Sequence, residues 1–85
     1  MTELIDMHSK INSFIAIFKV GFNVILAEVG ANMEVKILMN ISFKEELRHA
    51  WVTERKVLVC TGELTFVLQE RKGNWKSLEI DAQYG

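Results

Sequence analysis

The side chains of this chain that could do acid–base chemistry are few and widely spaced. Glu79 and Asp81 alternate along the last apolar segment, which puts both carboxylates on one face of a strand, about 7 Å apart. Enclosed beneath a covering element, such a pair could exchange protons or orient a ligand. Facing water, the two are the ordinary polar side of an antiparallel sheet. Their alternation with Leu78 and Ile80 favours this second interpretation.

His49 is the third acid–base candidate. It follows Arg48 and precedes Trp51 at the start of a strand, where an imidazole could act as a general base near neutral pH. A surface or half-buried histidine at a loop-to-strand junction is the more common case, and we favour it. His8, in the first segment, is a weaker candidate.

The single cysteine, Cys60, stands among valine and leucine residues and is predicted to be a buried, inert thiol. With no second cysteine to pair with, it favours a reducing, cytoplasmic setting. Cys60, His8 and His49 lack the spacing of zinc ligands, so no metal is predicted. The five glycines are too scattered for a phosphate-cradling loop, and no cofactor is predicted.

Length and composition indicate one globular domain covering residues 1–85. The chain is 49% apolar and 25% charged, with a net charge of −1. Its basic residues form two separate pairs, Arg55-Lys56 and Arg71-Lys72, each beside a glutamate. A nucleic-acid surface needs a basic stripe, so no nucleic-acid partner is predicted.

One apolar stretch could be mistaken for a membrane span. Residues 14–29 are too short for that role and include Lys19, Asn23 and Glu28, whereas a span needs about 20 apolar residues. No membrane partner is predicted.

The first third of the chain is predicted to be one helix. Gly30 supplies a C-terminal stop, and Thr2 can cap the N-terminus. Alternation from Phe18 to Val24 instead favours a strand, and Gly21 weakens a helix interior, so we expect a kink or break near Gly21. The helical prediction depends on apolar residues that recur at steps of three and four: Leu4, Met7, Ile11, Phe14, Ile15, Phe18, Phe22, Ile25 and Val29.

The rest of the chain alternates with a period of two, which is typical of strands. Residues 33–43 predict a half-buried strand, residues 44–49 a loop or single helical turn, and residues 50–53 the start of another strand. Residues 56–84 predict one long β-hairpin that turns at residues 72–74. The predicted class is therefore α+β, with an N-terminal helix packed on a curved antiparallel sheet of three to four strands.

The hairpin is predicted to have two unlike faces. Leu58, Phe66 and Ile80 are expected to face the core. A domain this small cannot cover a second apolar face, and exposed patches of that kind mark interfaces. We therefore predict a homodimer. The predicted interface residues are Val57, Val59 and Val67.

Two short motifs in the hairpin point to a family. Residues 59–66 (VCTGELTF) form a strand with Val-x-x-Gly-x-Leu-Thr-Phe character, and residues 73–76 (GNWK) form a Gly-x-Trp-Lys turn. This part of the chain resembles the SnoaL-like, ketosteroid-isomerase-like branch of the nuclear-transport-factor-like superfamily. The resemblance implies a curved sheet around a conical pocket, often in dimers, with isomerases, cyclases, hydrolases and non-enzymatic binders among the members. Where many members carry histidines in the last strand, this chain has Glu79 and Asp81.

We expect a small α+β homodimer that binds a small apolar ligand or a partner protein. The alternative is a SnoaL-like isomerase or hydrolase acting on a hydrophobic small molecule. Asp81, Glu79 and His49 would then be its acid–base candidates, with Trp51 and Tyr84 lining the pocket. A third class is a structural subunit whose sheet docks another chain. An enzyme requires a cavity that at least one of the three candidates enters.

Overall fold

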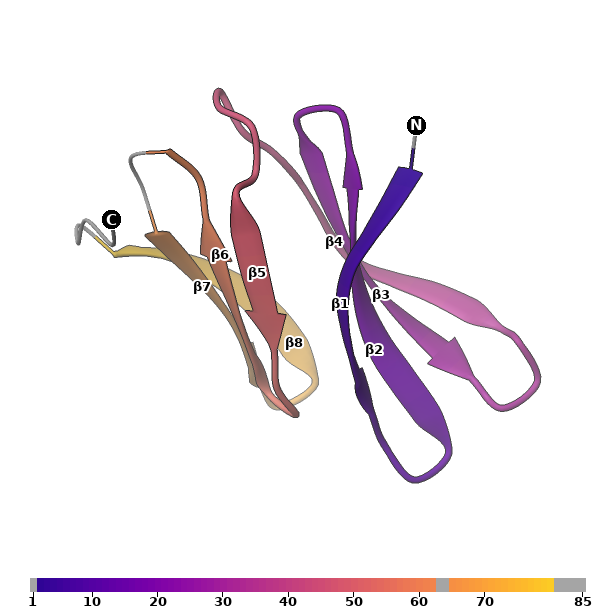
Figure 1. Cartoon of the computed structure of the whole chain (residues 1–85). Coiled ribbons are helices and arrows are strands. Elements are labelled where there is room, and N and C mark those ends of the chain that lie inside the picture. The colour runs from indigo at the N-terminus through magenta and orange to yellow at the C-terminus, as the bar shows by residue number, and fades with distance from the viewer. Residues whose placement is uncertain (1, 63–64, 81–85) are drawn as a thin grey trace.

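Two antiparallel sheets of four strands each make up this fold (Figure 1). The computed structural model describes residues 2–62 and 65–80, with side chains for residues 2–62 and 65–77. The strands of the first sheet are β1 (Thr2–Ser9), β2 (Ser13–Val20), β3 (Asn23–Gly30) and β4 (Val35–Ser42). Those of the second sheet are β5 (His49–Val52), β6 (Lys56–Cys60), β7 (Thr65–Arg71) and β8 (Asn74–Ile80).

The predicted N-terminal helix is wrong, and the class is all-β rather than α+β. The residues expected to form the helix make β1, β2 and β3, and the described residues include no helix. This segment is rich in β-branched and aromatic residues, which pack well on a pleated surface. Eight-residue strands alternate here with short turns, so apolar positions on successive strands fall at uneven steps that imitate a helical stripe.

Tight turns set the register of two hairpins. Gly21, with φ of 63°, is the first residue of the two-residue turn between β2 and β3, as in a type II′ turn, so it marks a turn rather than a helix kink. Lys72 and Gly73 have φ of 54° and 81°, the pattern of a type I′ turn. Arg71 pairs with Asn74 across that turn, which confirms the predicted position of the β7–β8 turn.

Each sheet is a meander, in which strands that follow one another in sequence also pair in space. Residues 43–48 form no strand or helix and carry the chain from β4, at one edge of the first sheet, to β5, which lies beside β1 (Figure 1). The predicted loop is therefore confirmed in this connection. The strand predicted over residues 33–43 is β4.

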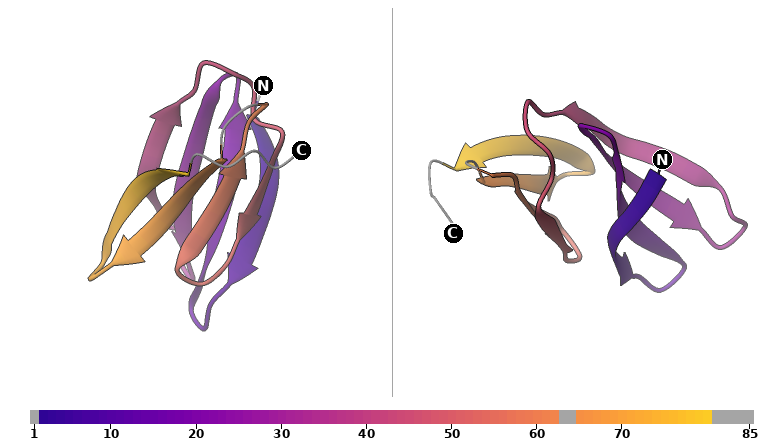
Figure 2. Two further views of the ribbon diagram at one scale, coloured as in Figure 1. Left: turned by 90° about the vertical axis from the view of Figure 1, so that its left-hand side faces the viewer. Right: turned by 45° about the horizontal axis from the view of Figure 1, so that its top comes forward.

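The hydrophobic core lies between the two sheets, which face each other as separate layers (Figure 2). Phe43 and Phe66 close part of it, with ring centroids 4.8 Å apart. Its buried residues come from β2, β3, β5, β6, β7 and the β4–β5 connection: Ile15, Ile17, Val24, Leu26, Leu47, Ala50, Val52, Val57, Val59 and Leu68.

The face assignment of the predicted hairpin is confirmed for Phe66 and wrong for Leu58, Val57 and Val59, and the side chain of Ile80 lies outside the described atoms. The register pairs Val57 with Leu68 and Val59 with Phe66, so both valines share the core-facing side with Phe66. Leu58 pairs with Val67 on the opposite side. The prediction assumes that residues 56–71 form one strand, whereas the chain turns back between β6 and β7. Odd-numbered residues face the core in β6, and even-numbered residues face it in β7.

Candidate functional site

The outer face of the first sheet carries no charged side chain among the paired residues of β1–β4. Its polar members lie at the ends and edges of the sheet: Thr2, Ser9, Asn23, Asn40 and Ser42. We call this surface the charge-free face. Its apolar members are Leu4, Met7, Phe14, Ala16, Phe18, Val20, Ile25, Ala27, Val29, Val35 and Ile37.

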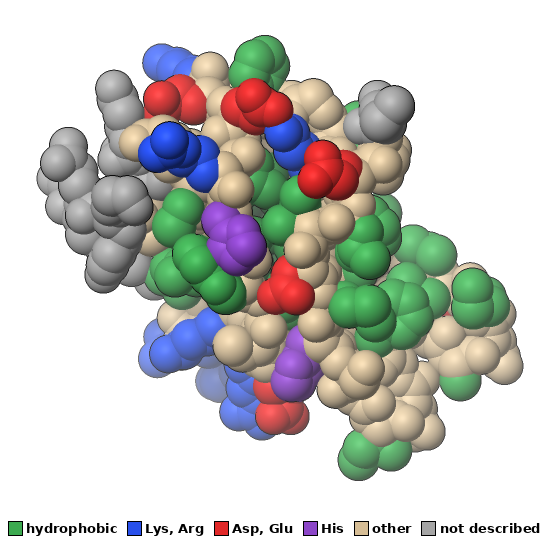
Figure 3. Space-filling view, viewed as in Figure 1, with side chains coloured by type: hydrophobic (Ala, Val, Ile, Leu, Met, Phe, Trp, Pro, Cys, Tyr) green, Lys and Arg blue, Asp and Glu red, His purple; other side chains and the backbone are tan. Residues whose placement is uncertain are grey.

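Large apolar side chains on the charge-free face are open to solvent. Val35 is 63% exposed, Ile37 56%, Leu4 50% and Met7 43%. On the right of Figure 3, where the first sheet lies, hydrophobic side chains gather at the surface. Large contiguous apolar patches on a protein surface mark interaction sites.

Two small residues occupy the middle of the charge-free face and are covered there. Ala16 pairs with Ala27, and these two residues are 0% and 1% exposed. The rows on either side carry the larger pairs Phe18–Ile25 and Phe14–Val29. The larger side chains around the two alanines therefore form the surface of this part of the face.

The charged residues of the first sheet all have the opposite register, towards the second sheet. They are Glu3, Asp6, His8, Lys19, Glu28 and Lys36. Two of the charged groups have partners at the rim of the core. Glu28 accepts a hydrogen bond from Ser13 Oγ at 3.2 Å and lies 3.6 Å from Lys10 Nζ. Lys19 donates to Glu46, and this hydrogen bond, with the positive charge of Lys19, holds the pKa of Glu46 below its ordinary value.

Asp6 joins the two sheets at the side where β1 lies beside β5. Its Oδ2 accepts a hydrogen bond of 2.8 Å from the backbone N–H of Val52, in β5. β5 is an edge strand whose outward N–H groups have no strand partner, so this carboxylate satisfies a donor that sheet pairing leaves free.

Asp6→Ala should lower the free energy of unfolding by about 1–3 kcal/mol, because the Val52 N–H loses a partly buried, charge-assisted acceptor. Urea unfolding followed by circular dichroism measures the change. Glu3→Ala, on the same strand and exposed, is the matched control and should stay within about 0.5 kcal/mol of the parent. Equal stability of Asp6→Ala and the parent would contradict this role.

His49 and Trp51 lie together on the second sheet. Both are exposed, and their rings meet edge to face with centroids 4.1 Å apart. Trp51 is 47% exposed. Neither residue lines any of the three surface pockets described for the molecule. His49 therefore contacts an aromatic ring, and none of these three pockets encloses it.

The other acid–base and pocket candidates, Glu79, Asp81 and Tyr84, lie near the C-terminal end of the sequence. Glu79 stands opposite Phe66 in the backbone register of β7 and β8, and its side chain lies outside the described atoms. Asp81 and Tyr84 lie outside the described residues. The roles assigned to these three residues stay predictions.

The predicted interface valines do not form one exposed face. Val57 and Val59 are 0% exposed and belong to the core. Val67 is half-buried on the outer face of the second sheet, opposite Leu58. Four large exposed apolar side chains lie instead on the charge-free face: Leu4, Met7, Val35 and Ile37.

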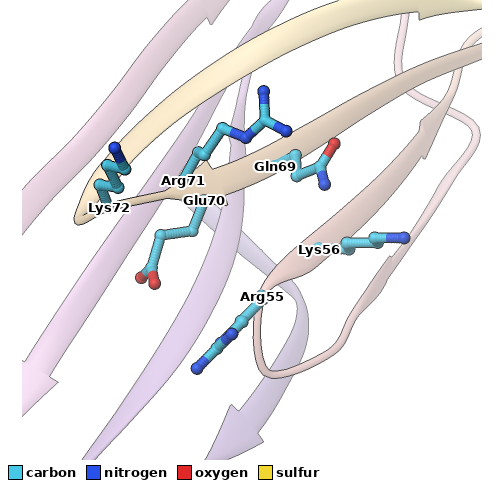
Figure 4. Close-up of a pocket in the computed structure, with 6 residues that line it drawn as sticks. All are labelled: Arg55, Lys56, Gln69, Glu70, Arg71 and Lys72. Carbon is cyan, nitrogen blue, oxygen red and sulfur yellow. The ribbon is translucent and has the colours of Figure 1, made fainter.

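The largest of the three pockets, of about 570 Å³, lies at the end of the second sheet (Figure 4). Its lining is almost entirely charged and consists of Arg55, Lys56, Gln69, Glu70, Arg71 and Lys72. The basic pairs that are separate in the sequence therefore meet in space. This proximity follows from the pairing of β6, β7 and β8, and no local sequence motif indicates it.

The described residues include neither a candidate metal site nor a candidate membrane-spanning helix. No group of three or more His, Cys, Asp and Glu side chains there could hold a metal ion. Within the same residues, no helix has the length and apolar character needed to cross a membrane. Cys60 is buried, with its Sγ 3.8 Å from Thr65 Oγ1.

Over the described residues, the fold defines an all-β protein of two stacked antiparallel meanders with one charge-free sheet face. Comparison of the chain with protein-family models, curated protein sequences and solved structures finds no match. The resemblance to SnoaL-like proteins stays a prediction.

Proposed function

We propose that this protein is a self-associating interaction module in which two copies pair through their charge-free faces. The observation that carries the proposal is a whole sheet face with no charged side chain and with large apolar residues open to solvent. Depletion of charged residues is the compositional mark of an interface core. Exposing such a face permanently to water would invite aggregation.

The area of the face suits a modest homodimer. Four strands about 4.8 Å apart, each rising about 3.3 Å per residue over eight residues, cover roughly 500 Å². Two such faces together bury about 1,000 Å², near the lower limit of specific interfaces. We therefore expect a dimer that dissociates on dilution.

A second copy is the partner that this face suits best. A face without charges has no electrostatic pattern with which to select a different partner. Paired with itself about a two-fold axis, it would stack two sheets about 10 Å apart, as in a β-sandwich.

Ile37→Lys tests the proposal. This side chain is 56% exposed, so the lone chain should tolerate a lysine there, whereas pairing would bury two unpaired ammonium groups. Sedimentation velocity should find a dimer for the parent and a monomer for the variant. Ile11→Lys makes the same chemical change in the β1–β2 turn, at a residue 97% exposed and off the face, and should stay dimeric. A monomeric parent, or an unchanged mass for Ile37→Lys, would refute the proposal.

Two further expectations accompany this proposal. The single cysteine, which has no second thiol in the chain, supports a reducing, cytoplasmic setting for the module. The isomerase or hydrolase alternative, and an apolar ligand, depend on a cavity near Glu79, Asp81 and Tyr84. No observation on the described residues favours them over self-association, and they stay predictions.

A further inference from the structure

Two hairpin ends bring five cations together at one end of the second sheet. The β5–β6 hairpin supplies Arg55, in its turn, and Lys56, the first residue of β6. The β7–β8 hairpin supplies Arg71, Lys72 and Lys76. The two hairpins are tied by a backbone hydrogen bond of 3.0 Å from the N–H of Glu70 to the carbonyl of Arg55. Half of the ten lysine and arginine residues of the chain therefore lie in this one region, although the chain as a whole carries a net charge of −1.

Three of these cations share the outer face of the sheet. Lys56, Gln69 and Lys76 form one row across β6, β7 and β8. Arg71 lies two residues beyond Gln69 and so points to the same side. In Figure 4 the side chains of Lys56, Gln69 and Arg71 extend to one side, whereas Arg55 and Glu70 extend to the other. The Glu70 carboxylate is thereby directed away from the outer-face cations.

The spacing of the outer-face cations suits one multiply charged anion. Arg71 is diagonal to Lys56 and to Lys76 on the neighbouring strands, at about 7–8 Å. Gln69 separates the two lysines and adds two amide donors between them. The described part of the chain has two ion pairs, and these involve other lysines, Lys10 and Lys19. No carboxylate among the described side chains makes an ion pair with the outer-face cations, so these cations repel one another.

We propose that Lys56, Gln69, Arg71 and Lys76 bind a small polyphosphate anion of two or three linked phosphate groups. The arginine offers a forked donor and the lysines offer mobile point charges, the two kinds of group that hold phosphates. Three cations spread over about 10 Å exceed the reach of a single phosphate and match linked ones. Lys56, Gln69 and Arg71 line the open pocket of about 570 Å³, which leaves room for the ligand, and Lys76 lines a neighbouring pocket together with Arg71.

A small anion fits this cluster better than a nucleic acid or a membrane surface. The cations are confined to the ends of three strands, and the same face continues into the apolar pair Leu58 and Val67. Nucleic-acid and membrane surfaces call for a longer basic stripe or a broader basic patch.

Isothermal titration calorimetry with inorganic triphosphate tests the site. The parent should bind, with an affinity that falls as salt is added. The double variant Lys56→Gln, Arg71→Gln should weaken binding at least tenfold. The double variant Lys36→Gln, Lys44→Gln removes the same charge from exposed positions elsewhere and should bind as the parent does. No binding by the parent, or equal weakening by both double variants, would overturn the proposal.

Two further measurements separate this site from a structural role and from larger ligands. Without the anion, the Lys56→Gln, Arg71→Gln variant should melt no lower than the parent, because the removed charges are exposed and repel; a lower melting temperature would assign them a structural role. If a single-stranded oligonucleotide or an anionic phospholipid vesicle binds the protein, triphosphate should displace it from the site. Tight binding of either one that triphosphate does not displace would overturn the small-anion assignment.

Discussion

Val59→Lys should unfold the protein. Val59 is 0% exposed and lies in the core between Ala50 and Phe66 on the neighbouring strands. A lysine there would bury an ammonium group with no partner, at a cost of several kcal/mol. Small domains have a total stability of about 5–15 kcal/mol, so this one substitution should remove most of it. Circular dichroism at 25 °C and urea unfolding would measure the loss.

Leu58→Lys is the matched control for that experiment. Leu58 is the adjacent residue of β6, half-buried on the outer face of the second sheet, where a lysine can extend its charge into water. The folded signal should be retained. If Leu58→Lys unfolds the chain and Val59→Lys does not, β6 faces the opposite way from the register described here.

Leu26→Ala should lower the free energy of unfolding by about 2–5 kcal/mol, the usual range for a leucine truncated in a well-packed core. Leu26 is 0% exposed and pairs with Ile17 on β2 and with Met39 on β4, so few groups can move to fill the cavity. Urea unfolding at low protein concentration gives the value for the dissociated chain. Ile37→Ala, at a side chain 56% exposed, should cost no more than about 0.5 kcal/mol there. Similar losses for the two variants would mean that the first sheet faces the core with its other side.

The two proposed sites lie on opposite sides of the molecule. The charge-free face is the outer face of the first sheet, and the outer-face cations lie on the outer face of the second sheet. A dimer paired through the first sheets would therefore carry two anion sites pointing outward. Two linked sites gain effective concentration for a ligand that can reach both. The proposals fail independently, because particle mass tests one and anion binding tests the other.

Much of the strand structure can be predicted from the sequence, but its first third cannot. The alternation of residues 33–43 and the Lys72-Gly73 turn are local signals, and β4 and the β7–β8 turn lie where they indicate. The helical stripe from Leu4 to Val29 is misleading because a bulge between Leu4 and Asp6 and the short turns shift the alternation. The strand-like alternation from Phe18 to Val24, with Gly21 at the turn, is the signal that matches the structure.

The excess of apolar residues in the segment that forms β2 reflects a strand that is apolar on both of its faces. Ile15 and Ile17 face the core, and Phe14 and Phe18 face the other way, so the strand is apolar on both sides. Such strands are typical of sheets buried on both faces. The predicted location of the second apolar face, at Val57 and Val59, is wrong. After the turn between β6 and β7 the even-numbered residues face the core, whereas in β6 the odd-numbered ones do.

The Lys72-Gly73 turn and the alternating segments after residue 33 can be predicted from the sequence alone, because turn chemistry and the two-residue period depend only on neighbouring residues. The side of each strand that faces the core depends on pairing between residues far apart, so it is defined only in the folded chain. The same pairing gathers uncharged residues of four strands on the outer face of the first sheet, and it joins two distant basic pairs at the end of the second. Neither surface exists until the strands are in register.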